Sequence, residues 1–124
     1  MQVIQWIEIP AQNLERAYQF YFSVLSGHVR KGSFQNQDVV LFDVPFQNGE
    51  AVGGSITVRE DLKPGTTGAL IYLNPFSTLS EAVHKVQAAG GQVLADQIPL
   101  GKFGYAAICM DTEGNKIGLL SHEA

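Results

Sequence analysis

The sequence has little of several features that would mark particular classes of protein. It contains one cysteine, Cys109, so no disulfide can form within the chain, and a reducing, cytoplasmic location is expected. It has only eight Lys and Arg residues and no basic run, which argues against nucleic acid or an anionic membrane as a partner. No apolar run reaches the length of a membrane span, and the first residues show no signal-peptide pattern.

The chain does contain enough apolar material for a hydrophobic core. Hydrophobic residues make up 45% of the 124 residues, charged residues make up 16%, and the net charge is -4. This composition argues against a disordered chain. It predicts one domain, or two small repeats fused into one.

Hydrophobic periodicity predicts the elements of the first half. A β-branched and aromatic run that ends at Pro10 is typical of a strand. Asn13 is a candidate helix N-cap, and apolar residues then recur at helical spacing until Gly27, a plausible helix end. The predicted elements are a strand at 3–9, a helix at 14–25, and strands at 39–44 and 55–58.

The same order is predicted again after a polar linker that contains Pro64 and Gly65. Thr78 and Glu81 form the Thr-x-x-Glu pattern of a capping box at the head of a second helix, which a Gly-Gly pair ends. The predicted elements are a strand at 69–73, a helix at 79–89, a short strand plus a loop over 92–100, and strands at 105–111 and 116–121.

The two halves match at a spacing of 65 residues. Each helix begins with the same Leu-x-x-Ala pattern, at Leu14 and at Leu79, and each follows a strand. The order predicts a single α+β domain of two βαβββ modules, with module one at 1–60, a linker at 61–68 and module two at 69–124. Two curved sheets, each with a helix on one face, can pack so that their free concave faces line a ligand cleft.

Three stretches resemble the vicinal oxygen chelate superfamily, which includes glyoxalase I, extradiol dioxygenases and bleomycin-resistance proteins. They are NLERAYQFY at 13–21, AAGGQVL at 88–94 and GYAAICMDTEGNKIGLL at 104–120. The last is similar to the family's closing hairpin, G-x-x-A-x-x-x-D-P-E-G-N-x-I-x-L. The resemblance extends over nearly the whole chain and implies the paired βαβββ fold. It implies no single activity, because this fold hosts lyases, dioxygenases, epimerases and binding proteins.

The resemblance also implies where metal ligands would lie. Metal enzymes of the superfamily carry His or Glu on the first strand of each module and Glu on the last. Those positions fall here on Trp6, Ile71, Gly118 and a residue near 53–56. An indole N–H has no lone pair for a metal, and Ile and Gly side chains have no donor atom. A slip of one residue would bring Tyr72 or Ile7 to the same face without restoring a His/Glu set.

No metal and no other cofactor is therefore expected, and the missing side chain of Gly118 is expected to leave a small space that faces Trp6 across the cleft. Trp6 could be a stacking platform or ordinary half-buried core. Glu8, on the same strand face, could line the pocket or be an exposed or salt-bridged carboxylate. The loop at 101–105 could border the ligand or be a flexible connection. The predicted ligand-binding residues are Trp6, Glu8, Ile71, Tyr72, Phe103, Tyr105 and Gly118.

Two functions of different classes follow from these residues. The favoured one is a metal-free protein that binds a small, partly aromatic molecule, similar to the bleomycin-resistance proteins. The alternative is a glyoxalase-like metal-dependent lyase, isomerase or dioxygenase with displaced ligands. The sequence shows no dedicated nucleophile or base, so it leaves open whether the protein is an enzyme. A homodimer is expected, because relatives with this architecture are usually dimeric and the sheets would otherwise expose long edges.

Overall fold

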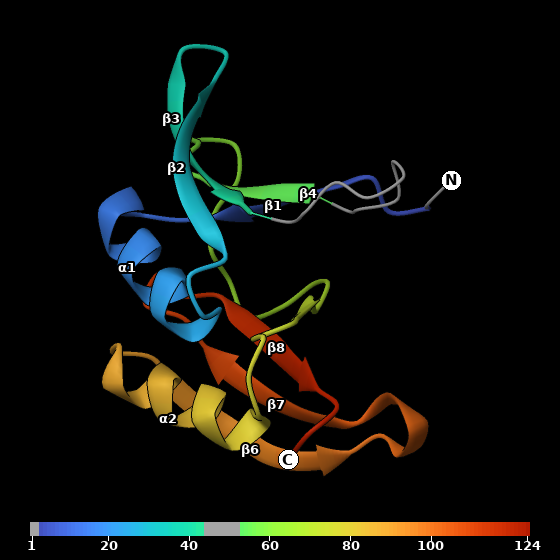
Figure 1. The fold of residues 1–124 in the computed structure, drawn as a ribbon. Helices are drawn as coiled ribbons and strands as arrows, with labels where there is room; N and C mark the ends of the chain where they lie inside the picture. Colours follow the sequence, from blue (N-terminus) through green and yellow to red (C-terminus); the bar gives the residue numbers. More distant parts are fainter. Residues whose placement is uncertain (1–2, 44–52) are drawn as a thin grey trace.

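The computed structural model describes residues 3–43 and 53–124 and shows two four-stranded sheets, each with one helix against one face (Figure 1). The elements are β1 (Trp6–Pro10), α1 (Leu14–Val24), β2 (Val29–Phe34), β3 (Gln37–Phe42), β4 (Gly53–Thr57), β5 (Tyr72–Leu73), α2 (Leu79–Ala88), β6 (Gln92–Pro99), the 3-10 turn η1 (Gly101–Phe103), β7 (Tyr105–Met110) and β8 (Lys116–Ser121). The predicted α+β fold of two βαβββ modules is confirmed.

The two sheets have the same topology. Sheet one has the order β1-β4-β3-β2, and sheet two has the order β5-β8-β7-β6. In each sheet the first and last strands of the module are parallel neighbours, and the other neighbours are antiparallel. β1 and β5 therefore occupy equivalent places, each at the edge of its sheet, and so do their partners β4 and β8.

Both helices begin and end where their sequences predict. The side chain of Asn13 accepts a hydrogen bond from the backbone N–H of Arg16 at 3.0 Å, and Thr78 accepts one from Glu81 at 3.2 Å. Such caps satisfy backbone N–H groups that have no partner within the helix. Gly27 follows α1 with a φ of +84°, a left-handed conformation that a glycine adopts without steric cost. None of the helices in the described residues is long and apolar enough to cross a membrane.

The two modules share one hydrophobic core. The helices α1 and α2 pack against each other, and each covers one face of its own sheet (Figure 1). The fully buried residues that fill this space include Ala17, Phe20, Tyr21, Val24, Ile56, Leu79, Val86, Ala107 and Leu119. Because side chains alternate across a strand, the residues between these core positions lie on the opposite faces, which no helix of the described residues covers. We call these the open face of sheet one and the open face of sheet two.

Some strands differ from those predicted. β2 was not expected, because most of its residues are polar or glycine and exposed, so the sequence lacks an apolar alternation there. It pairs with β3 through a two-residue turn in which Gln35 and Asn36 both have positive φ, as in a type I′ hairpin. β6 is one eight-residue strand rather than a short strand plus a loop. Two register shifts in its pairing with β7 accommodate the polar residues in its middle.

Other boundaries moved by a few residues. The strand expected at 69–73 is reduced to Tyr72–Leu73, with Ala69 and Leu70 exposed before it. The strand expected at 39–44 covers Gln37–Phe42, and its last expected residue, Val44, lies outside the described residues.

The turn between β7 and β8 joins module two to the start of α1. The carboxylate of Glu113 accepts hydrogen bonds from the backbone N–H groups of Gln12 and Asn13 at 2.9 and 2.7 Å. It also binds Arg16, with 2.7 Å between Nε and Oε2, and it accepts the hydroxyl of Thr112 at 2.9 Å. Burial alone would raise the pKa of Glu113, but these hydrogen bonds outweigh burial and hold it below its ordinary value.

Asp111 anchors the same turn from within. It accepts the Tyr21 hydroxyl at 2.6 Å and the backbone N–H groups of Glu113 and Asn115, each at 2.8 Å. Asn115 in turn donates to the carbonyl of Pro10 at 2.7 Å. Burial and the neighbouring carboxylate raise the pKa of Tyr21 well above its usual value. The stretch that the sequence marks only as a turn is thus a polar joint between the modules.

Candidate functional site

A groove of about 400 Å³ lies on the open face of sheet one. β4 contributes Ser55 and Thr57 to its floor, and β3 contributes Val39 and Leu41 beside them. Its remaining lining comes from β1, the β2–β3 hairpin and the residue two beyond β4: Trp6, Glu8, Phe34, Gln35, Gln37 and Arg59. The structure therefore brings together two of the predicted residues, Trp6 and Glu8, in one concave site built from module one alone.

Trp6 provides an exposed aromatic surface in this groove. It is 54% exposed, so it is not part of the core. Its ring lies against Gly53, its neighbour on β4: a Cβ atom added to Gly53 would come within 2.8 Å of Cζ3 of Trp6. Real carbon contacts lie near 3.5–4.0 Å. The glycine thus lets the indole ring lie close to the strand, with the rest of the ring free for a ligand.

Thr57 is a buried polar residue of the floor. The residue is only 6% exposed, and its hydroxyl oxygen has no hydrogen-bond partner among the described residues. A buried hydroxyl without a partner costs about 1–3 kcal/mol, and most buried polar groups in native proteins are satisfied. Because Thr57 lines the groove, a bound molecule that displaces the atoms shielding this oxygen can supply the missing partner.

One ion cluster forms the charged side of the groove. Arg59 binds Glu8 through Nη1, at 3.0 and 2.8 Å to the two carboxylate oxygens. It binds Asp61 through Nε and Nη2, at 2.9 and 2.7 Å. The hydrogen bonds from Arg59 lower the pKa of Asp61, and the two carboxylates raise the pKa of Arg59. Glu8 is thus both a salt-bridged carboxylate and a groove residue.

The equivalent place in sheet two corrects one predicted position. Trp6 pairs with Gly53, and Tyr72, not Ile71, pairs with Gly118. Tyr72 is therefore the counterpart of Trp6, one residue beyond the expected position. Ile71 has the opposite orientation and packs against the core. The short β5 gives too little alternation in the sequence to fix this register.

The space expected over Gly118 is filled. A Cβ atom added there would lie 2.5 Å from Cδ1 and 2.9 Å from Cγ of Tyr72, so the phenol ring lies over the glycine. Gly118 is buried beneath this ring and does not leave a hollow that faces Trp6. The prediction of a space over Gly118 was wrong because it did not consider the aromatic side chain on the neighbouring strand. Each sheet instead carries one aromatic ring over one glycine.

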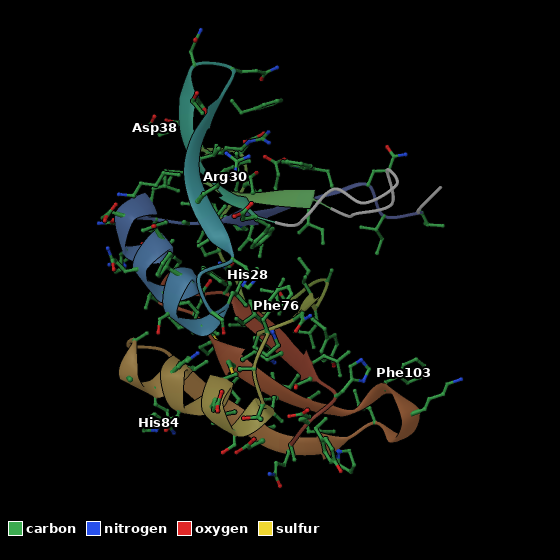
Figure 2. All side chains as sticks on the ribbon, viewed as in Figure 1. His28, Arg30, Asp38, Phe76, His84 and Phe103 are labelled. Atoms are coloured by element: carbon green, nitrogen blue, oxygen red, sulfur yellow. The ribbon has the colours of Figure 1, made fainter. Side chains whose placement is uncertain are left out.

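The two remaining predicted residues lie at the far end of sheet two. Phe103 belongs to η1 and is 59% exposed, and Figure 2 shows it at the loop between β6 and β7. Tyr105 alternates with Ala106 and so shares the face of Ala107, which the core covers. Neither lines the groove on sheet one. The predicted set is therefore divided between the two sheets.

The positions that the resemblance implies for metal ligands, adjusted to the pairing of β5 with β8, hold Trp6, Gly53, Tyr72 and Gly118. Only Tyr72 among them has a side-chain oxygen, and a divalent metal site needs about three good protein ligands. Across residues 3–43 and 53–124 no three His, Cys, Asp or Glu side chains come together. The residues present do not fit a divalent metal at this place.

Two further features lie outside the groove. His28 stacks on Phe76 between the modules, with ring centroids 3.8 Å apart, beside an apolar recess of about 310 Å³ (Figure 2). Cys109 is buried, and burial raises the pKa of its thiol to about 11, as expected for an inert cysteine.

Thr57 and Arg59 line the groove but were not predicted as site residues. A signal for Thr57 was present, because the period of two in the predicted strand at 55–58 places Ser55 and Thr57 on one face, opposite Ile56. No signal marked Arg59, which lies in a polar stretch that resembles an ordinary linker.

No protein-family model matches the sequence, and a search of curated proteins finds no match either. Solved structures do match. A glyoxalase/bleomycin resistance protein from Albidiferax ferrireducens has a TM-score of 0.71 at 20% identity, covering 96% of this chain and 98% of that one. A member of the glyoxalase/bleomycin resistance protein/dioxygenase superfamily from Sphaerobacter thermophilus has a TM-score of 0.63 at 22% identity, covering 97% of both chains.

An antibiotic-binding protein from a Streptomyces species is a further match, with a TM-score of 0.60 at 20% identity over 97% of this chain and 95% of that one. The chain therefore has the fold of the glyoxalase/bleomycin resistance/dioxygenase superfamily, as the resemblance of its sequence implied.

Proposed function

We propose that this protein binds a small, partly aromatic molecule, without a metal, in the groove on the open face of sheet one. The observation that carries the proposal is the buried, unpartnered hydroxyl of Thr57 in the floor of a groove whose exposed aromatic wall is Trp6. Trp6 offers a flat apolar surface for a ring, and Thr57 offers one directional hydrogen bond. An antibiotic-binding protein with the same fold supports a binding role.

We propose further that the protein is a cytoplasmic homodimer. Its single cysteine is a buried thiol, in keeping with a reducing compartment. β1 and β5 each lie at the edge of a sheet, and a paired copy would cover such edges. Several large apolar side chains on sheet two and its turn η1 are exposed, among them Tyr72, Leu94 and Phe103. Sedimentation at micromolar concentration should give twice the 13.5 kDa chain mass, and a monomer would refute this part.

A screen of small aromatic molecules by thermal shift tests the binding function. A ligand at about a hundred times its Kd stabilises the fold by about 2.7 kcal/mol. Each hit is then titrated while the fluorescence of Trp6, the only tryptophan in the sequence, is recorded. Because Trp6 lines the groove, a molecule bound there changes its emission directly.

The variant Thr57→Val separates groove binding from binding elsewhere, because it replaces only the hydroxyl by a methyl group. Loss of one hydrogen bond to the ligand should weaken binding about tenfold. Thr66→Val, in the exposed linker, is the matched control and should leave the affinity unchanged. If hits stabilise the fold yet neither alter Trp6 emission nor respond to Thr57→Val, the groove is not the binding site.

Elemental analysis tests the metal-dependent alternative of a lyase, isomerase or dioxygenase. The protein is purified without a histidine tag and its content of Zn, Ni, Mn and Fe is measured. We expect less than stoichiometric metal, because the mapped ligand positions hold two aromatic–glycine pairs. One equivalent of a divalent metal per chain would overturn the proposal of a metal-free binding protein.

A further inference from the structure

Among the described residues, the ion cluster beside the groove has unbalanced charges. Glu8 and Arg59 are the charged residues of its lining, and Asp61 is a second carboxylate on the same guanidinium. The guanidinium of Arg59 thus binds two carboxylates. The cluster of Glu8, Arg59 and Asp61 has a net charge of about one negative unit at neutral pH. Arg30, also on the β2 side of this sheet, has its own partner in Asp43, 3.9 Å away, so this pair adds no net charge (Figure 2).

Every nitrogen of the Arg59 guanidinium already contacts a carboxylate. Its Nη1 is held by Glu8, and its Nε and Nη2 are held by Asp61. A carboxylate or phosphate on a ligand would reach only the remaining N–H groups of Arg59 and would meet both carboxylates at short range. A positively charged group, in contrast, gains a favourable interaction with the surplus negative charge without breaking either ion pair.

Residues that line the groove follow one another in a fixed order along β4 and β1. Along the chain, Ser55, Thr57 and Arg59 are alternate residues that all line it, so Thr57 lies between the other two. Glu8 is paired with Ser55 across the parallel strands, and Trp6 with Gly53 one step further along. An aromatic ring on Trp6 therefore has the carboxylate of Glu8 as the next side chain on the same strand face.

We propose that the groove selects aromatic molecules that carry a positively charged nitrogen, with the ring on Trp6, the cation beside Glu8 and Asp61, and a hydrogen-bonding group at Thr57. This inference rests on the proposed function and adds the class of ligand. The ring face of Trp6, where it remains exposed, attracts the same cation.

The test uses three probes that share a phenyl ring and a short chain: phenethylamine, phenethyl alcohol and phenylacetate. Each is titrated into the protein at low salt, and Trp6 emission is excited at the red edge of its band, where a phenyl ring does not absorb. One net charge at about 4 Å in water predicts that the amine binds about fivefold tighter than the alcohol and about thirtyfold tighter than the carboxylate. Added salt should reduce both ratios.

The variant Glu8→Gln makes the cluster neutral, so the preference for the amine should fall to less than about threefold. Asp38→Asn is the matched control. It removes one negative charge from β3, but Asp38 lines a different groove beside α1 and not this one. It should retain the preference of the wild type. If Glu8→Gln does not fold, Asp61→Asn makes the same change of charge at a more exposed side chain.

The outcomes separate the two proposals. If all three probes bind equally, respond to Thr57→Val and quench Trp6, the groove binds small molecules but does not select cations, and only this inference fails. If phenylacetate binds best, the sign of the selection is wrong. If no probe changes Trp6 emission up to millimolar concentration, the proposed function and this inference fail together.

Discussion

The ring of Tyr72 over Gly118 makes a quantitative prediction about a double-mutant cycle. In the wild type, Gly118→Ala places a methyl group 2.5–2.9 Å from three ring atoms, among them Cγ, which is close to the root of the side chain. The ring cannot avoid the methyl group by a small tilt and must rotate away from the strand. Overpacking of this kind costs about 1–3 kcal/mol.

A second effect acts in the opposite direction. The backbone of Gly118 is not in the left-handed region, so alanine can adopt its conformation without strain. Replacing such a glycine by alanine stabilises a protein by about 0.4–1 kcal/mol, chiefly by restricting the unfolded chain. The net effect of Gly118→Ala in the wild type should therefore be a loss of about 0.5–2 kcal/mol.

The same substitution in a Tyr72→Ala background should have the opposite sign. With the ring gone, only the gain of about 0.4–1 kcal/mol remains. The coupling between the two sites should be about 1–3 kcal/mol, well above the deviation of about 0.3–0.5 kcal/mol that independent sites show. The assay is urea denaturation followed by circular dichroism for the wild type, both single variants and the double variant. Additive effects, or a wild-type protein stabilised by Gly118→Ala, would falsify the ring-over-glycine geometry.

Three further predictions use the same measurements. Gly53→Ala should cost about 1 kcal/mol or less, because the added methyl group meets the far end of the Trp6 indole, and it should shift Trp6 emission; an unchanged spectrum contradicts this. Thr57→Val should raise the free energy of unfolding by about 1 kcal/mol without ligand, since it removes an unpartnered buried hydroxyl; a loss of stability contradicts this. Glu113→Gln should cost about 1–3 kcal/mol at neutral pH. Because the folded-state pKa of Glu113 lies below its ordinary value of 4.5, its stabilising effect is present above that pH and is lost as the pH falls. The free energy of unfolding of the variant should therefore fall less than that of the wild type as the pH is lowered. Parallel acid curves for variant and wild type contradict this.

The repeated order of elements could be predicted from the sequence because it depends on local signals. The helix caps at Asn13 and Thr78 and the apolar spacing of both helices need no tertiary information, and both are present in the structure. β2 could not be predicted from the sequence, because its residues are mostly exposed. Its pairing is set by a two-residue turn that lacks the usual Asn-Gly signal.

The site could be predicted only in part, for a different reason. Trp6 and Glu8 could be placed on one strand face by counting alternate residues, and both line the groove. The position in module two depends on the pairing of Tyr72 with Gly118, and a two-residue strand provides no alternation from which to count. Arg59 reaches the groove only because Glu8 and Asp61 hold its guanidinium, which is a tertiary arrangement.

Glu113 has a consequence for the way the chain is made. The N–H groups at the start of α1 bind a carboxylate that follows them by 101 and 100 positions in the sequence. Translation proceeds at about 5–20 residues per second, so the beginning of α1 waits on the order of 5 to 20 seconds for its partner to be synthesised. During that interval the first half on the ribosome has a core that α2 does not yet cover.

The final hairpin is thus the step that completes the first helix. A nascent chain arrested before residue 113 should expose to chaperones the side of α1 that packs against α2, whereas one released after the hairpin has formed should not. Such long-range closure also places the molecule among the more slowly folding topologies, since distant contacts require large loops to close first. The joint that fastens the two modules in the finished protein can therefore form only after both modules have been synthesised.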